Sequence, residues 1–120
     1  MKNIDSYTHT RGESIYVDDL PILGGTLFAA IFDSPIAHGK ITKLDVAQTR
    51  LLAGVKHVIT HENIPGENQI GGIFLDEPAL ADDAVHFRGQ ALAIVLATSK
   101  KIAHEALKTI VFEAAPLPII

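Results

Sequence analysis

Short uninterrupted runs of apolar residues, each closed by turn-forming residues, dominate the hydrophobic pattern of this chain. Residues 91–97 read Ala-Leu-Ala-Ile-Val-Leu-Ala and follow Gly89-Gln90, while the run at 26–32 lies between Gly25 and Asp33-Ser34-Pro35. Apolar runs of this length without polar alternation are typical of buried strands. The pattern therefore predicts strands over both segments. Shorter stretches that mix apolar and polar residues predict three more strands, at 40–44, 55–60 and 111–113.

Two further segments are flanked by residues that typically begin or end helices. The first is predicted at 47–52, because the Asp45 carboxylate can accept hydrogen bonds from the free N–H groups of the first turn and Gly54 can end the last one. The second follows a cap at Thr98 or Ser99 and is the more regular of the two. Its apolar positions recur on one helix face, at Ile102, Ala103, Ala106, Leu107 and Ile110.

Polar, turn-rich segments separate these elements and define the domain organisation. Residues 1–24 contain glycines and a proline that break any periodic pattern, so we expect an extended N-terminal arm. Residues 25–120 are then a single domain, in which 61–83 is a long loop with six acidic residues and neither lysine nor arginine. Each predicted helix is followed by a strand that can return to the same sheet. The pattern thus predicts an α+β domain with one mixed sheet and two helices.

The composition limits the functions that the chain can have. A chain of 120 residues with 48% hydrophobic side chains is long enough for one domain with its own core. Its net charge of −4 supplies no positive surface for phosphates, so we expect neither nucleic acid nor membrane as a partner. The absence of cysteine excludes disulfides, thiolate metal sites and a cysteine nucleophile in this chain. No segment has the apolar length of a signal core or a membrane span, which predicts a cytoplasmic protein.

The six histidines are the first candidates for a metal site. His57 and His61 have the i, i+4 spacing that binds zinc on a helix, but this segment reads as a strand, which would hold the two rings about 13 Å apart. His38 follows Pro35 in a turn and can hydrogen-bond a backbone carbonyl there. We therefore predict structural histidines and no metal site.

Other candidate motifs for binding or catalysis are excluded by their spacing or their neighbours. The glycines at 66, 71 and 72 do not lie between a strand and a helix start, so they predict no phosphate loop. The acids of the loop lack the alternate spacing of a calcium site, and no serine lies in a nucleophile elbow. Lys40, after Gly39, is the nearest candidate for a biotin or lipoate carrier lysine, but it lacks the small or Met neighbours of such lysines. The sequence thus assigns no catalytic, cofactor-binding or metal-binding residue.

A series of punctuated segments carries a resemblance to a known family. In chain order they are Arg11-Gly12-Glu13-Ser14-Ile15-Tyr16-Val17-Asp18-Asp19, Ser34-Pro35-Ile36-Ala37-His38, Ala53-Gly54-Val55, residues 64–71 with Asp76-Glu77-Pro78, and Val85-His86-Phe87-Arg88-Gly89-Gln90. Their order and spacing resemble the N-terminal α/β-hammerhead domain of the molybdenum-binding large subunit of the xanthine dehydrogenase and aldehyde oxidase family, the molybdenum hydroxylases. The fourth segment is closer to the xanthine dehydrogenase type. The sequence departs from the family at 113–118, where relatives often read Glu-Tyr-Glu-x-Leu-Pro and this chain reads Glu-Ala-Ala-Pro-Leu-Pro.

The resemblance implies a function that this domain serves without performing chemistry. Members of the family hydroxylate a heterocycle or an aldehyde with oxygen from water, using a molybdopterin cofactor, and pass electrons through iron–sulfur clusters to FAD or another acceptor. Their catalytic and cofactor-binding residues lie in later domains or other subunits. The implied role here is structural: packing against the molybdopterin-binding domain, with iron–sulfur and flavin domains or subunits as further partners, and no activity alone.

A free-standing interaction module with the hammerhead fold is the alternative. The chain ends on the apolar residues Leu-Pro-Ile-Ile, where relatives continue into the next domain, whereas a free module would be expected to end on a polar tail. This favours a fragment of a larger oxidoreductase subunit.

Overall fold

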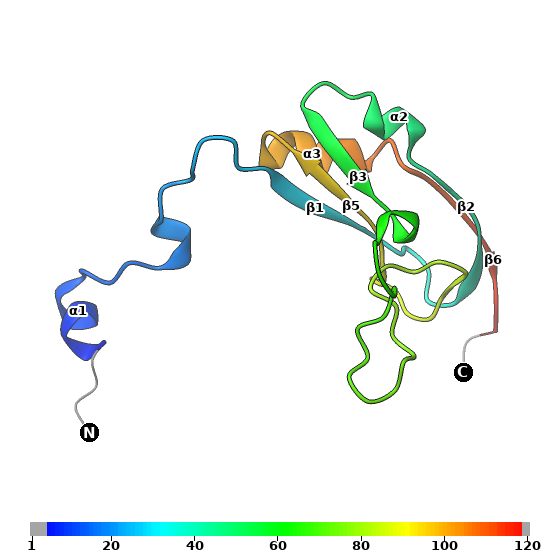
Figure 1. Cartoon of the computed structure of the whole chain (residues 1–120), viewed down its shortest axis with the longest axis horizontal. Helices are drawn as coiled ribbons and strands as arrows, with labels where there is room; N and C mark the ends of the chain where they lie inside the picture. The colour runs from blue at the N-terminus through cyan, green and yellow to red at the C-terminus, as the bar shows by residue number, and fades with distance from the viewer. Residues whose placement is uncertain (1–4, 119–120) are drawn as a thin grey trace.

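The computed structural model describes residues 5–118, and Figure 1 shows how their helices and strands are arranged. In chain order the elements are α1 (Ser6–Arg11), the 3-10 helix η1 (Val17–Asp19), β1 (Phe28–Asp33), β2 (Gly39–Asp45), α2 (Ala47–Arg50), β3 (Val55–Ile59), the 3-10 helix η2 (His61–Asn63), β4 (Ala84–Val85), β5 (Ala91–Ala97), α3 (Lys100–Leu107) and β6 (Val111–Pro116).

The strands form two three-stranded antiparallel sheets. In sheet A the order is β1-β5-β3, and in sheet B it is β4-β2-β6. The apolar strand β5 lies at the centre of sheet A, where Ile94 pairs with Ile31 on one side and with Ile59 on the other. In sheet B, β2 pairs with β6 from Gly39, opposite Pro116, to Asp45, opposite Val111.

The α+β class is confirmed, but the strands connect differently from the single mixed sheet that the sequence predicted. Helix α2 leads from β2 in sheet B to β3 in sheet A, and α3 leads from β5 in sheet A to β6 in sheet B. Both helices therefore join the two sheets, and neither closes a crossover within one sheet. The reason is that β1 and β3 occupy both edges of β5, while β2 offers an open edge to β6.

The core lies between α3 and sheet A and is built from small side chains. Ala103 and Ala106 on α3 are fully buried, as are Ala93 and Ala97 on β5. Because alanine has only a methyl group, the helix backbone can approach the sheet closely and gain dispersion contacts with it. The core is thus aliphatic, with alanine at the helix–sheet contact.

A buried pair of hydroxyl groups ties α2 to the turn after α3. The Oγ1 atoms of Thr49 and Thr109 are 2.8 Å apart, and Thr49 is fully buried. Thr109 Oγ1 also donates to the Ala106 carbonyl at 2.8 Å. Since a hydroxyl has one proton, Thr49 must be the donor to Thr109.

We expect Thr49→Val to lower the free energy of unfolding by about 1 kcal/mol, because it keeps the side-chain shape and removes the donor to Thr109. Urea denaturation monitored by circular dichroism measures the loss. The control is Thr42→Val at an exposed position on β2, which should change stability by less than about 0.5 kcal/mol. Equal losses in the two variants would contradict a role for this hydrogen bond.

The observed element boundaries agree best with the predicted ones where strand pairing or a capping residue determines them. Strand β5 has the predicted bounds, and Ser99, one of the two predicted caps, accepts a hydrogen bond from the Ile102 N–H at 3.2 Å. Helix α2 ends at Arg50 and is shorter than predicted, although Asp45 Oδ1 accepts from the Ala47 N–H at 2.9 Å at its start. Strand β6 continues to Pro116, past its predicted end, because Pro116 still pairs with Gly39. The short strand β4 was not predicted.

The N-terminal segment before β1 projects away from the two sheets (Figure 1). It contains α1 and η1 within the part expected to be extended, and neither element has a buried residue. The radius of gyration is 18.8 Å, whereas a compact domain of this length has about 14 Å. The projecting segment accounts for this excess.

Candidate functional site

Two of the family-like segments meet where β1 ends and β5 begins. The Ser34 N–H donates to the Gln90 carbonyl, and the Gly89 N–H donates to the Ser34 carbonyl, both at 2.9 Å. Gly89 has a φ of +90°, a conformation that glycine adopts without strain. The Gln90 side chain accepts from the His86 N–H at 2.7 Å, and Ser34 Oγ donates to the Ile36 carbonyl at 2.8 Å. Ser34 and Gln90 are buried, so these motif residues satisfy backbone groups in a buried turn.

A third family-like position, His38, fastens the C-terminal part of the described chain. Its Nδ1 lies 2.8 Å from the Pro118 carbonyl oxygen, and the Leu117 N–H donates to the His38 carbonyl at 3.2 Å. The ring also stacks on His86, with centroids 5.9 Å apart. His38 contacts a backbone carbonyl as predicted, but that carbonyl belongs to Pro118 and not to the turn in which the sequence predicted it. His38 therefore holds the end of β6 beside the start of β2.

The side chain of Asn68 forms two hydrogen bonds across the long acidic loop. Its side-chain Nδ2 donates to the Leu80 carbonyl at 2.7 Å, and its Oδ1 accepts from the Leu80 N–H at 3.0 Å. Leu80 and Ala81 are buried, and the Ala81 N–H donates to the Ala91 carbonyl at 2.8 Å. The Asn68 amide thus takes the place of a strand partner for Leu80, and the hydrogen bond of Ala81 to Ala91 attaches the loop to the start of β5.

We expect Asn68→Asp to release this loop, because a carboxylate cannot donate to the Leu80 carbonyl and would place a negative charge against it. Loss of a partly buried hydrogen bond that leaves the Leu80 carbonyl without its donor costs about 2 kcal/mol. Hydrogen exchange should show the Leu80 and Ala81 amides exchanging more than about tenfold faster. The same amide-to-acid change at exposed Gln48 on α2 is the control and should leave both rates unchanged. Unchanged exchange in Asn68→Asp would show that the amide does not hold the loop.

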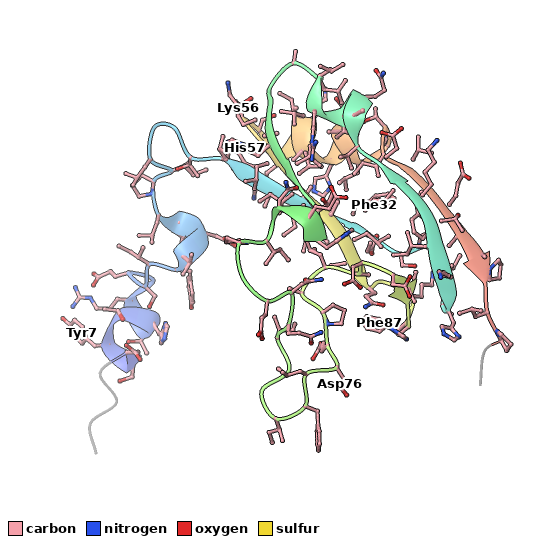
Figure 2. All side chains as sticks on the ribbon, turned by 45° about the vertical axis from the view of Figure 1, so that its right-hand side comes forward. Tyr7, Phe32, Lys56, His57, Asp76 and Phe87 are labelled. Carbon is pink, nitrogen blue, oxygen red and sulfur yellow. The ribbon has the colours of Figure 1, made fainter. Side chains whose placement is uncertain are left out.

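Among the described residues, exposed large apolar side chains are most concentrated in two segments. The loop between Asn68 and Leu80 exposes Ile70, Ile73, Phe74 and Leu75, and Ile73 is 90% exposed. In Figure 2 this loop, marked by Asp76, stands apart from Phe32 in the body of the domain. The projecting N-terminal segment exposes the second set, Ile15, Tyr16, Val17, Leu20, Ile22 and Leu23. Clusters of exposed large apolar side chains are typical of contact sites with other proteins or domains.

The remaining sequence candidates do not converge on a reactive site. His57 lies on β3 and His61 in η2, and among residues 5–118 no group of three His, Cys, Asp or Glu side chains could hold a metal ion. Lys40 lies within β2, opposite Ala84 and Ala115, and its Nζ is 3.8 Å from Asp83 Oδ1, so it is not at a hairpin tip. No described helix is long and apolar enough to cross a membrane.

Sequence reasoning missed the residues that hold these segments together, namely Thr49, Asn68 and the side chain of Gln90. Each is a polar residue in or beside a turn, where such residues are common, so composition gives no signal. The one usable hint is the position of Gln90 directly before the most apolar strand, since a polar residue there must find a partner once it is buried.

Comparison with known proteins points to the same family as the motifs in the sequence. Residues 11–118 match the family model described as "Aldehyde oxidase and xanthine dehydrogenase, a/b hammerhead domain". The chain is 36% identical over 110 residues to the nicotinate dehydrogenase large molybdopterin subunit of Eubacterium barkeri, covering 92% of this chain and 26% of that protein. It is 36% identical over 111 residues to the xanthine dehydrogenase of Drosophila pseudoobscura pseudoobscura, covering 91% of this chain and 8% of that protein. The chain therefore spans about a quarter or less of these relatives.

Solved structures agree with the sequence relatives. Aldehyde oxidoreductase from Desulfovibrio gigas superposes with a TM-score of 0.84 at 28% identity, covering 96% of this chain and 14% of that chain. Quinoline 2-oxidoreductase from Pseudomonas putida 86 gives a TM-score of 0.83 at 31% identity, covering 96% and 16%. The expected fold is confirmed, and xanthine dehydrogenases, aldehyde oxidases and nicotinate dehydrogenase match at similar identities. The chain belongs to the aldehyde oxidase and xanthine dehydrogenase family of molybdenum hydroxylases, as its α/β-hammerhead domain.

Proposed function

We propose that this chain is the structural hammerhead domain of a larger molybdenum hydroxylase subunit and is inactive alone. The observation that carries the proposal is the family match over 11–118, which covers nearly all of this chain but 26% or less of the relatives described above. The parent enzyme would be a cytoplasmic oxidoreductase that hydroxylates a heterocycle or an aldehyde with oxygen from water.

The exposed apolar residues support a packing role for the domain. We infer that residues 25–120 are the folded unit, and that the projecting segment and the loop carrying Ile73 and Phe74 bury their apolar side chains against other parts of the subunit. The molybdopterin-binding domain is the proposed main partner, with iron–sulfur and flavin domains or subunits beyond it. Burial of apolar surface at about 25 cal/mol per Å² would stabilise the assembled subunit.

The described residues do not fit the molybdopterin cofactor. Three hollows among the described residues are open to solvent, and one of them is lined by side chains of both signs, Lys43, Arg50, Asp45 and Glu62 among them. A cofactor site instead needs a concave, largely enclosed pocket with converging polar groups. We therefore place the catalytic and cofactor-binding residues in other domains and assign none here.

The size of the native protein tests this proposal. An antibody raised against the chain, applied to a denatured extract of the source cells, should detect a band several times larger than 12.9 kDa. The purified chain should also bind no molybdenum in stoichiometric amounts. A band at 12.9 kDa would instead favour a free-standing interaction module.

A further inference from the structure

One face of sheet A is aliphatic and lacks the helix that covers the other face. Ala30, Val58 and Val95 belong to the core with α3, so their strand neighbours lie on the opposite face. The strand pairing aligns these neighbours in two rows, Ala29–Leu96–His57 and Ile31–Ile94–Ile59. Ile31 is 56% exposed, and Ile59, Ile94 and Leu96 are half-buried. We call the five aliphatic residues of these rows the open face.

A cationic hollow borders the open face along β3. Its volume is about 430 Å³, and its lining includes Arg50, Lys56 and His57 beside Ile59 and Leu96 of the open face. Figure 2 shows Lys56 and His57 next to each other on β3. No acidic side chain lines this hollow, although the chain as a whole has a net charge of −4. The lining of this hollow is therefore cationic, although Arg50 also lines the neighbouring hollow that contains Asp45 and Glu62.

The cations of this border are available to a partner. Within residues 5–118, the two ion pairs are Arg11 with Glu13 and Lys40 with Asp83, so neither Arg50 nor Lys56 is neutralised by a carboxylate. Arg50 Nη2 donates to the Val58 carbonyl over 3.5 Å, at the outer limit of a hydrogen bond. A guanidinium held beside an apolar floor is well suited to bind a carboxylate with two parallel hydrogen bonds.

We propose that the open face docks an extended polypeptide segment that carries both aliphatic side chains and carboxylates. The aliphatic side chains would lie on the open face, and the carboxylates would bind Arg50 and Lys56. The free edge of β3 is a poorer site, because the strand contains a bulge between Val55 and His57 with the charged Lys56 inside it, and bulges and charged side chains both oppose strand addition. The source of the segment rests on the proposed function: it would be a part of the subunit outside these 120 residues, since the relatives are several times longer.

The test uses an isotopically labelled chain and the capped peptide Glu-Val-Glu-Leu-Glu-Val-Glu. NMR titration should shift the methyl signals of Ile31, Ile94 and Leu96, and the peptide with lysine in place of glutamate should shift none of them. The double variant Arg50→Gln, Lys56→Gln should weaken binding by about tenfold or more, as expected for the loss of charge-assisted hydrogen bonds. Lys100→Gln with Lys101→Gln removes the same charge from α3 and should leave the affinity unchanged.

Equal binding of the lysine peptide, equal weakening in the α3 double variant, or shifts confined to the loop at 70–75 would each overturn the proposal. Carbodiimide coupling of the native protein tests the source of the segment. It should join Lys56 to an acidic peptide outside residues 1–120, and coupling to a second copy of this chain would reject that source. If the native protein is large but the isolated hammerhead domain does not bind the peptide, the docking proposal is rejected and the proposed function is not. A native protein of 12.9 kDa rejects the proposed function.

Discussion

Leu92→Ala is expected to lower the free energy of unfolding by about 3 kcal/mol. Leu92 lies in the central strand β5, is completely buried, and heads the fully buried side chains by volume. Truncation removes buried methyl and methylene groups and leaves a cavity that the surrounding strands cannot fill, which costs about 2–5 kcal/mol in comparable cores. Since small domains have only about 5–15 kcal/mol of stability, this single change removes a large part of it.

Chemical denaturation of the two proteins under the same conditions measures this effect. The matched control is Leu75→Ala, the same truncation at a loop residue that is 68% exposed, and it should shift stability by less than about 0.5 kcal/mol. Similar denaturation midpoints for the two variants would contradict the position of Leu92 in the core.

Gly39→Ala is expected to destabilise the chain by about 2 kcal/mol through a backbone clash. A Cβ at this position would lie 2.7 Å from Ile36 Cδ1 and 2.9 Å from the Ala115 carbonyl oxygen. The Ile36 side chain can turn away, but the carbonyl belongs to β6 and is held by the pairing of Lys40 with Ala115. The amides of β6 should therefore exchange faster with solvent, while those of β5 keep their rates.

Gly66→Ala serves as the control for this substitution. Its Cβ would have no neighbour within 4 Å, and its φ is not positive. Alanine there should be neutral or stabilising by about 0.5 kcal/mol, because it restricts the unfolded chain. A Gly39→Ala protein as stable as the Gly66→Ala protein would show that β2 and β6 are less closely packed than described.

The sequence was informative where a local pattern determines the structure. The apolar run at 91–97 is β5, and the capping serine before α3 holds the predicted helix start. Sheet membership could not be read from the chain, because pairing of β2 with β6 joins residues about seventy positions apart. An apolar run predicts burial, but it does not carry information on which neighbour will bury it.

The residues that resemble the family also carry structural information, but they form turns and not a reactive site. Ser34 and Gln90 were noted as parts of separate motifs, and the structure brings them together by hydrogen bonds between their backbone groups. In the sequence Asn68 is only part of a punctuated segment, and its side-chain hydrogen bonds to Leu80 cannot be predicted from that segment because Leu80 lies twelve residues away. Short motifs in this domain therefore mark turns that hydrogen-bond to other segments of the chain.

The separation of β2 from β6 also has a consequence for synthesis on the ribosome. Sheet A is complete once β5 has emerged, because β1, β3 and β5 all lie within the first 97 residues. Sheet B must wait for β6, and until then β2 has only the two-residue strand β4 as a neighbour. The nascent domain thus exposes the edge of β2 that β6 will occupy for the time needed to add α3 and β6, a few seconds at about 5–20 residues per second. During that interval the free edge of β2 is the part of the domain most in need of protection by chaperones.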